Sequence, residues 1–387
     1  MARIFEVNSL SEYINFVSKN NLNNFISRGE NKNFDGIIAS AFRYQTPIKF
    51  QNMILQFYNT IGNDVTNMQR ENFVAFSQHH GIPTNLIDFS LSPLVSLFFA
   101  CYNSDGGSDE SGYVYFISKD RLINISDMMF CTSFQENIFQ NLMRFEASTS
   151  LVIPQLYEYI HTHLQEIQQM IVEWANKLKL DKATKKKYKH LFPIISEFNK
   201  ACKIDRDYAL DDYSQKILGQ IIKSNEDDGG NSSDFILWDE YIKSCHNLFE
   251  DLLKKSQYKY SDYLVLVLIL IRTVLGELYD FSYTKELVRN INLPFYFTYY
   301  PPNILSRVEN QSSLFIYQLY YDCDLIDPYI DETEHRIIQN ISPDYTLKVN
   351  CKEEILDALD SVGINLKFIY SDYDNIAKYI KSKNLGL

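Results

Sequence analysis

Several residue types that mark common protein classes are scarce in this chain of 387 residues. The 13 glycines form neither the G-x-x-x-x-G-K loop that cradles nucleotide phosphates nor the G-x-G-x-x-G turn of dinucleotide-binding folds. The six cysteines include no C-x-x-C pair, which argues against structural zinc and against a disulfide framework. We therefore expect no metal site and neither of these two nucleotide-binding loops.

The chain also has fewer basic than acidic residues, and it has no long apolar run. Lysine and arginine number 37 against 49 aspartates and glutamates, a net charge of −12. Nucleic acids and anionic membranes are bound mainly by clustered Lys and Arg, so this balance argues against both, although it leaves room for a small anion pocket. The longest apolar run, residues 264–271, is much shorter than the roughly 20 residues that span a bilayer. The first residues lack the apolar core of a signal peptide, so we expect a cytoplasmic protein.

The pattern of apolar residues and turn signals predicts a mixture of helices and strands. Ser9 followed by Glu12 predicts a capped helix, and Pro93 predicts the start of another. Predicted helices cover residues 8–20, 44–80, 93–101, 352–361 and 373–381, and predicted strands cover residues 24–30, 84–89, 112–118, 313–321 and 366–370. Between about 135 and 285 helical periodicity dominates. The expected fold class is α+β: a mixed small sheet with flanking helices, interrupted by an all-helical insertion.

The densest polar cluster of the sequence lies at residues 78–90. It places Gln78, His79, His80 and Asp88 on a short loop and strand between two rigid elements, which suits the exact positioning of functional side chains. A buried network that ties down the turn and caps the next helix would use the same residue types. A shared metal ion is disfavoured, because adjacent side chains point to different faces of a strand or helix.

Two further clusters carry arginine. At the end of a predicted strand, Gly29 would let the backbone approach a ligand closely while the Arg28 guanidinium binds phosphate or carboxylate. An Arg–carboxylate pair inside a polar core is the alternative. Later in the chain, Arg307 and Gln311 lie one helical turn apart and would share a face of a helix.

Taken in this order, the clusters resemble the FRG domain, a family named for an N-terminal aromatic-Arg-Gly motif. The opening motif is matched by Ser-Arg-Gly-Glu at residues 27–30 and Phe-Arg at residues 42–43. The middle signature, Q-H-x-G-x-P-T-R-L-L-D-W followed by P-L-V-A-L-F-F-A, is matched at residues 78–89 and 93–100. A late element with Pro-Pro, Arg, Gln and Phe is matched at residues 301–315.

This chain departs from the family pattern at four positions. They are Ser27, where the family has an aromatic residue, Asn85 in place of Arg, Phe89 in place of Trp, and Ser313 in place of Gly. The change at Asn85 removes a cation from the expected pocket, whereas the other three are changes that we expect the fold to tolerate.

The resemblance implies a domain division and a function. Residues 1–134 would be the N-terminal part of an FRG-like domain, residues 135–285 a helical insertion, and residues 286–387 the C-terminal part. The protein would be an intracellular bacterial phage-defence effector of the abortive-infection type. Its Arg-Gly motif is similar to that of ADP-ribosyltransferases, in which such an Arg anchors NAD. We therefore expect NAD as the cofactor of an ADP-ribosyltransferase or NAD hydrolase.

The same resemblance implies two groups of site residues. The expected catalytic residues are Arg28, Glu30, His79, His80 and Asp88, and the expected ligand-binding residues are Gly29, Arg43, Gln78, Thr84, Arg307 and Gln311. Which carboxylate would act on the ribose stays open. Gln311 stands where a glutamate would be wanted, and Glu309 and Glu30 are the substitutes.

Two other functions use different parts of the chain. In an RNA-acting nuclease, His79 and His80 would do acid–base work and the lysine-rich run at residues 182–189 would bind phosphate, although the net charge of −12 counts against it. In a non-catalytic sensor, the helical block would bind a protein partner or a phage trigger, and the polar cluster would be a buried network.

Overall fold

The structure of the chain is a computed structural model that describes residues 4–34, 36–44, 47–103, 111–138, 152, 155, 159, 162–163, 288–293, 295–302, 309–322, 336–370 and 372–385. Nearly all of the predicted insertion, including the lysine-rich run, lies outside these residues, as does Arg307. The predicted three-part division of the chain therefore stays a prediction. None of the described helices is long and apolar enough to cross a membrane.

The chain divides into two compact units. The first comprises Met1–Ser126, Phe295–Gln318 and Asn340–Leu387, and the second comprises Asp127–Pro294 and Leu319–Gln339. Among the described residues, the second unit contributes a three-stranded sheet in the order β6 (Val288–Asn292), β10 (Arg336–Asn340) and β9 (Tyr320–Asp322). In this small sheet the buried Arg336 side chain forms an ion pair with Asp322, with 2.5 Å between Nε and Oδ1.

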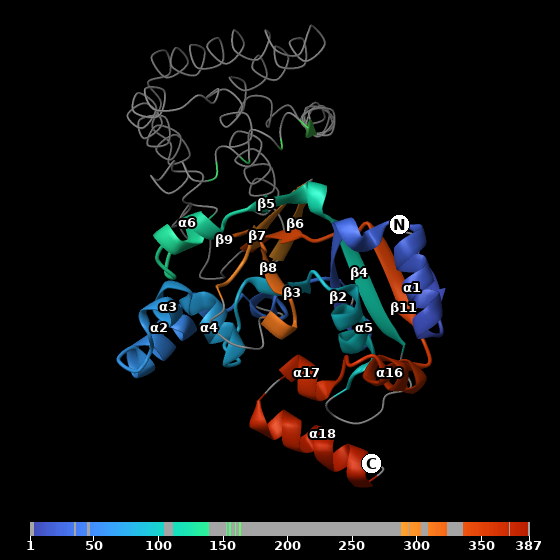
Figure 1. Cartoon of the computed structure of the whole chain (residues 1–387). Helices are drawn as coiled ribbons and strands as arrows, with labels where there is room; N and C mark the ends of the chain where they lie inside the picture. Colours follow the sequence, from blue (N-terminus) through green and yellow to red (C-terminus); the bar gives the residue numbers. More distant parts are fainter. Residues whose placement is uncertain are drawn as a thin grey trace, which may run out of the picture. The chain divides into compact units, whose positions relative to one another are not determined.

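An open sheet of eight strands forms the centre of the first unit (Figure 1). Its order is β1 (Ile4–Val7), β11 (Tyr345–Val349), β4 (Gly112–Ser118), β2 (Phe25–Glu30), β3 (Leu86–Ser90), β8 (Ser313–Tyr317), β7 (Tyr296–Tyr299) and β5 (Leu122–Asn124). The outer pairs β1–β11 and β5–β7 are parallel, and the other neighbours are antiparallel. The sheet thus confirms the expected mixed fold with flanking helices, and it joins strands from both ends of the chain.

Helices α1 (Leu10–Lys19), α5 (Pro93–Cys101) and α16 (Lys352–Ser361) cover the half of the sheet that contains β1, β11, β4 and β2. The core between them is apolar and includes Tyr13, Leu97, Phe116, Leu347 and Ile355, all of them fully buried. On β2, Ser27 and Gly29 face this core because they pair with Phe116 and Val114 of β4. Arg28 and Glu30 lie on the opposite face.

Local signals in the sequence place several elements correctly. The Ser9 hydroxyl caps α1 by accepting a hydrogen bond from the backbone N–H of Glu12 at 3.3 Å, and the Glu12 carboxylate accepts one from the N–H of Asn8 at 2.7 Å. Pro93 stands in the first turn of α5, as predicted. The predicted strands at β2, β3 and β4 and the predicted helix α16 are confirmed within two residues at each end.

Three predicted elements are wrong. The single helix expected over residues 44–80 is three helices, α2 (Phe50–Ile61), α3 (Asn67–Glu71) and α4 (Phe73–His79), because Thr66 and Gln69 form a capping box that starts a new helix. The strand expected at residues 366–370 is the helix α17 (Leu366–Tyr370), in which the Asn365 side chain accepts a hydrogen bond from the N–H of Phe368 at 3.0 Å. The strand expected at residues 313–321 is interrupted, so that β8 and β9 belong to different sheets.

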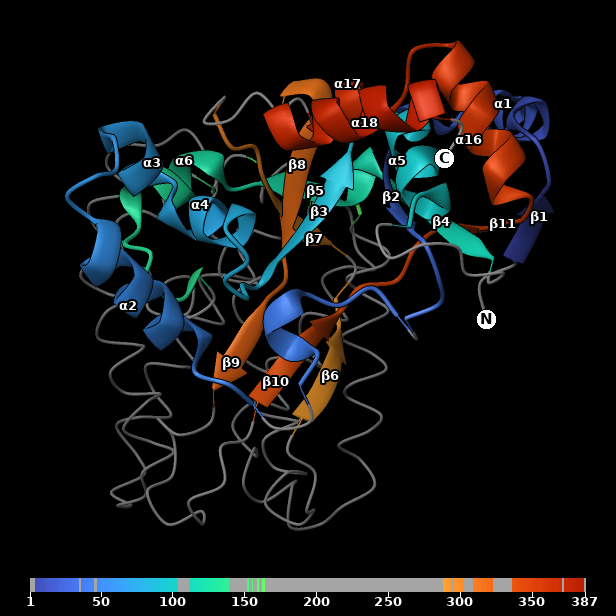
Figure 2. The ribbon, with the colours of Figure 1, turned by 90° about the horizontal axis from the view of Figure 1, so that it is seen from below.

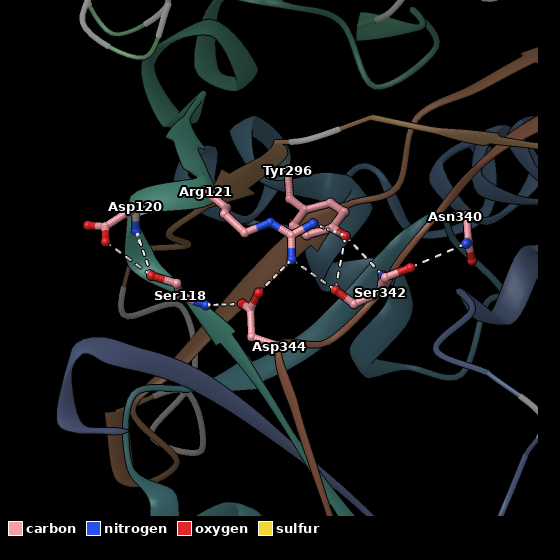
Figure 3. A network of polar contacts seen from close by, with 7 residues as sticks. All are labelled: Ser118, Asp120, Arg121, Tyr296, Asn340, Ser342 and Asp344. Atoms are coloured by element: carbon pink, nitrogen blue, oxygen red, sulfur yellow. Dashed lines mark hydrogen bonds and ion pairs between the residues drawn. The ribbon is translucent and has the colours of Figure 1, made fainter. Parts of the chain in front are cut away.

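A polar network fastens the C-terminal part of the first unit to the end of β4 (Figure 3). The Arg121 guanidinium donates to a carboxylate oxygen of Asp344 at 3.0 Å, to the backbone oxygen of Ser342 at 3.1 Å and to the hydroxyl of Tyr296 at 2.8 Å. The backbone N–H of Ser118 donates to the other Asp344 oxygen at 2.7 Å. Burial raises the pKa of Tyr296, so its hydroxyl stays protonated at neutral pH.

Replacement of Arg121 by alanine is expected to lower the free energy of unfolding by about 2 kcal/mol, because the Ser342 oxygen and the Tyr296 hydroxyl lose a charged donor. Urea unfolding followed by circular dichroism measures this loss. The matched control is Arg70→Ala on α3, which removes an exposed arginine and is expected to change stability by less than about 0.5 kcal/mol. Equal stability of the two variants would show that the network carries no net stabilisation.

Candidate functional site

The eight-stranded sheet parts in its middle, between β2 and β3. These two strands pair at one register position, Ser27 with Ser90, whereas β2 pairs with β4 along its full length. Where the strands separate, the Arg28 guanidinium bridges them and donates from Nη1 to the backbone oxygen of Asp88 at 2.8 Å. Helices α4 and α5 lie on either side of β3 in both ribbon views (Figures 1 and 2). A side-chain hydrogen bond from an arginine thus links the two strands where backbone pairing between them ends.

A cavity of about 440 Å³ lies at this parting, a volume within the range of small-molecule sites. Polar and aromatic side chains from β2, β3, α4, α5 and β8 surround it. The described residues that line it are Ser27, Arg28, Gly29, Ala75, Phe76, Gln78, His79, Gly81, Asp88, Phe89, Ser90, Ser96, Phe99, Pro301, Gln311, Ser313 and Phe315. Asp88 contributes the carboxylate among these residues, and Arg28 contributes the guanidinium.

A chain of side-chain hydrogen bonds orients the Asp88 carboxylate. The Gln78 amide nitrogen donates to Asp88 Oδ2 at 2.9 Å, and the Gln78 amide oxygen accepts the hydroxyl of Thr84. Thr84 is fully buried, and its Oγ1 also accepts the N–H of Leu86 at 3.2 Å. Because Thr84 fixes which end of the amide faces Asp88, the carboxylate is held by a donor that cannot rotate freely.

In comparison with known proteins, residues 23–108 match the family model of the FRG domain. The chain carries an FRG domain. The match runs from the start of β2 past the end of α5, so it contains Arg28, Gln78, His79 and Asp88. Gln311, Ser313 and Phe315 complete the cavity from outside the matched range. Searches of curated proteins and of solved structures found no match.

The two adjacent histidines of the FRG domain have different surroundings. His79, the last residue of α4, lines the cavity, whereas His80 does not. The His80 ring packs against Phe76 with 4.5 Å between centroids and lies 6.0 Å from the ring of Phe57. Gly81 follows with a φ of +89°, a left-handed conformation that favours glycine at this turn. The structure therefore separates a histidine that faces the cavity from one that packs beside α4.

Glu30 lies beside the cavity rather than in its lining. Its side chain is 2% exposed, and its Oε1 accepts the Arg28 Nε–H at 3.0 Å and lies 3.9 Å from Nη2 of Arg43. Burial, followed by the charge of Glu30, raises the pKa of the neighbouring Tyr115, which therefore stays a neutral phenol. The pair of Arg28 with Glu30 has the form of the Arg–carboxylate pair that the sequence offered as the alternative for the Arg28 cluster.

Gly29 is required by packing against α5. A Cβ atom added at Gly29 would lie 1.8 Å from the backbone oxygen of Ser96 and 2.7 Å from the backbone nitrogen of Ala100. The glycine therefore lets β2 and α5 approach closely, which brings Ser96 into the cavity lining. The sequence predicted correctly that the backbone at Gly29 is closely approached. It predicted a ligand as the neighbour, whereas the neighbour in the described structure is the backbone of α5.

Other expected site residues lie in supporting positions. Gln311 lines the cavity and donates from its amide to the backbone oxygen of Ile369 at 3.1 Å. Asn85 is buried and donates to the backbone oxygen of Gln318 at 3.2 Å, so the position where the family has an arginine does not line the cavity. Among the described residues, no group of His, Cys, Asp and Glu has the arrangement of a metal site.

Sequence reasoning missed the apolar and hydroxyl part of the lining. Phe76, Phe89, Phe99 and Phe315 line the cavity, while Ser27 and Ser96 share a hydrogen bond of 2.8 Å between their hydroxyls. The signal for Ser96 was available, because it is the one polar residue inside the apolar helix α5. Phe89 and Phe315 stand at positions of the FRG motifs, whereas nothing marks Phe76 and Phe99 among the 26 phenylalanines of the chain.

Proposed function

We propose that the FRG domain binds a nucleotide in this cavity and cleaves its N-glycosidic bond, with NAD as the substrate to test first and phage defence as the biological setting. The observation that carries the proposal is the convergence of Arg28, His79 and the oriented Asp88 carboxylate on one cavity. A guanidinium can bind phosphate, a carboxylate can stabilise a developing positive charge, and an imidazole can accept a proton.

Each group has a role that follows from its chemistry. Arg28 would bind a phosphate or ribose oxygen of the nucleotide, since a guanidinium offers several donors in a fixed plane. The Asp88 carboxylate would stabilise the positive charge that develops on the ribose as the bond to the base breaks. We assign to it the role that the FRG resemblance left open, because Glu30 is paired with Arg28 and neither Glu30 nor Glu309 lines the cavity.

The reaction balances without a further reactant. In NAD the bond between the ribose C1′ and the nicotinamide nitrogen breaks, and its electron pair stays on the nitrogen, which leaves as neutral nicotinamide. A bond forms between C1′ and the oxygen of water or of a nucleophile on an acceptor molecule. The proton of that oxygen passes to a base, for which His79 at the cavity wall is suitable.

Incubation of the purified protein with NAD, with and without cell lysate, tests the proposal by mass spectrometry. Release of nicotinamide that is lost in Arg28→Ala supports it, and labelled lysate proteins would identify transfer rather than hydrolysis. Absence of nicotinamide release under both conditions contradicts it. Cleavage of RNA by the same preparation, with a steep salt dependence, would favour the nuclease instead.

The two histidines are expected to respond differently to substitution. His79→Ala should lower the rate of nicotinamide release by about 100-fold, because the base at the cavity wall is lost. His80→Ala should leave the rate close to that of the wild type and lower the melting temperature, because its ring packs against Phe76. Steady-state kinetics and thermal melts of both variants separate the two roles, and equal loss of rate in both would contradict the assignment.

A further inference from the structure

An exposed aromatic ring near the cavity gathers two cations. Phe34 is 37% exposed, and its ring centroid lies 5.2 Å from Nζ of Lys32 and 5.3 Å from Cζ of Arg43. The electron-rich face of an aromatic ring attracts cations at this range. In the described part of the chain Lys32 forms no ion pair. Arg43 lies 3.9 Å from the Glu30 carboxylate and donates from Nε to the backbone oxygen of Ile38 at 3.3 Å. The ring therefore lies beside two cations, and Lys32 has no carboxylate partner among the described residues.

This cationic cluster of Lys32, Phe34 and Arg43 is connected to the cavity through one buried carboxylate. Glu30 Oε1 is shared by Arg43 and by Arg28, and Arg28 lines the cavity. The other oxygen, Glu30 Oε2, is buried and accepts no hydrogen bond from the described residues. One carboxylate thus stands between two guanidinium groups.

The described ionic side chains around Glu30 include more cations than anions, although the chain as a whole is acidic. Lys32, Arg28 and Arg43 carry three positive charges, whereas Glu30 and Asp88 supply two negative ones, and the whole chain has a net charge of −12. Partial burial and the charge of Arg28 lower the pKa of Arg43, while Glu30 and Asp88 oppose that shift. A bound anion would relieve the repulsion between the cations.

We propose that Arg43 and Lys32 bind the diphosphate of the nucleotide whose reacting end lies in the cavity. The cavity volume of about 440 Å³ is near the lower end for small-molecule sites, so a dinucleotide needs a second binding region outside it. Arg43 is the next cation beyond Arg28, and its side chain is 38% exposed. The ligand would run from the cavity past Arg28 to the cationic cluster. The placement of its reacting end in the cavity rests on the proposed function.

Isothermal titration calorimetry with ADP-ribose tests this subsite without requiring turnover. Arg43→Ala should weaken binding at least tenfold, because a charged hydrogen bond to phosphate is lost. Lys32→Ala should weaken it less, and the affinity of the wild type should fall with added salt. Nicotinamide riboside, which has no phosphate, should bind the wild type and both variants equally. The control Arg70→Ala should bind ADP-ribose as the wild type does.

The variants keep the proposal falsifiable even if Arg43→Ala fails to fold. The Lys32 side chain is exposed, so its loss should leave the fold intact. ADP-ribose affinity that is unchanged in both variants, or absent in the wild type, would overturn the subsite. Binding that depends on Arg43 without nicotinamide release from NAD would support the subsite and contradict the proposed reaction.

Discussion

Asp88→Asn is expected to lower kcat for nicotinamide release from NAD by about 100- to 1000-fold, since the variant removes the negative charge that stabilises the transition state. The amide oxygen of asparagine can still accept the hydrogen bond that Gln78 donates to Asp88 Oδ2, so the local geometry should persist. KM for NAD and the melting temperature should change little. A loss confined to kcat would identify a group that acts on the transition state rather than on substrate binding.

The matched control for this variant is Asp120→Asn. Asp120 is an exposed carboxylate in the 3-10 turn after β4 and does not line the cavity, so its substitution should leave kcat unchanged. Wild-type kcat in Asp88→Asn would remove Asp88 from the reaction. Equal losses in Asp88→Asn and Asp120→Asn would point to a general effect of charge rather than to a role in the cavity.

Gly29→Ala is expected to lower the free energy of unfolding by about 3 kcal/mol or more. Its Cβ atom would lie 1.8 Å from the backbone oxygen of Ser96, and backbone atoms of a buried helix cannot move aside as a flexible side chain can. The clash would push α5 away from β2 and displace Ser96 and Phe99 from the cavity wall. Stability, measured by urea unfolding, and ligand binding should therefore be lost together.

Gly36→Ala is the control for the glycine variant. Gly36 has a φ of +135°, but nothing lies within 4 Å of the position of an added Cβ atom. This variant should lower the free energy of unfolding only by the strain of the backbone conformation, about 1–3 kcal/mol. Ligand binding in the cavity should be unchanged. A Gly29→Ala protein as stable as the wild type would show that β2 and α5 pack less closely than the structure indicates.

Much of the local structure was predictable because its signals lie within a few residues of one another. Ser9 with Glu12, Pro93 and the alternation over residues 84–89 each act over one turn or one strand, and each predicted its element correctly. The errors occurred where short apolar runs are ambiguous. Residues 366–370 were predicted as a strand from their apolar content, whereas the Asn365 cap makes them a helix.

The cluster at residues 78–90 was identified from the sequence, but its division of roles was not. The FRG signature has its histidine at residue 79, but both histidines were expected to be catalytic. Only the structure shows that His79 lines the cavity and that the His80 ring packs against Phe76. The choice of Asp88 over Glu30 likewise depends on the structure, in which Glu30 is paired with Arg28 and does not line the cavity.

The sequence by itself determined the mixed fold, the residue types of the site and the resemblance to the FRG domain, because these follow from composition, short-range periodicity and motif order. The tertiary structure decided which strands are neighbours, where the sheet parts and which side chains meet there. Ser90 bonds the backbone oxygen of Gln311 at 2.6 Å across 221 residues of chain, and no local pattern records such a contact. Strand pairing over that separation is selected by the packing of the whole core, and the cavity is a consequence of that packing.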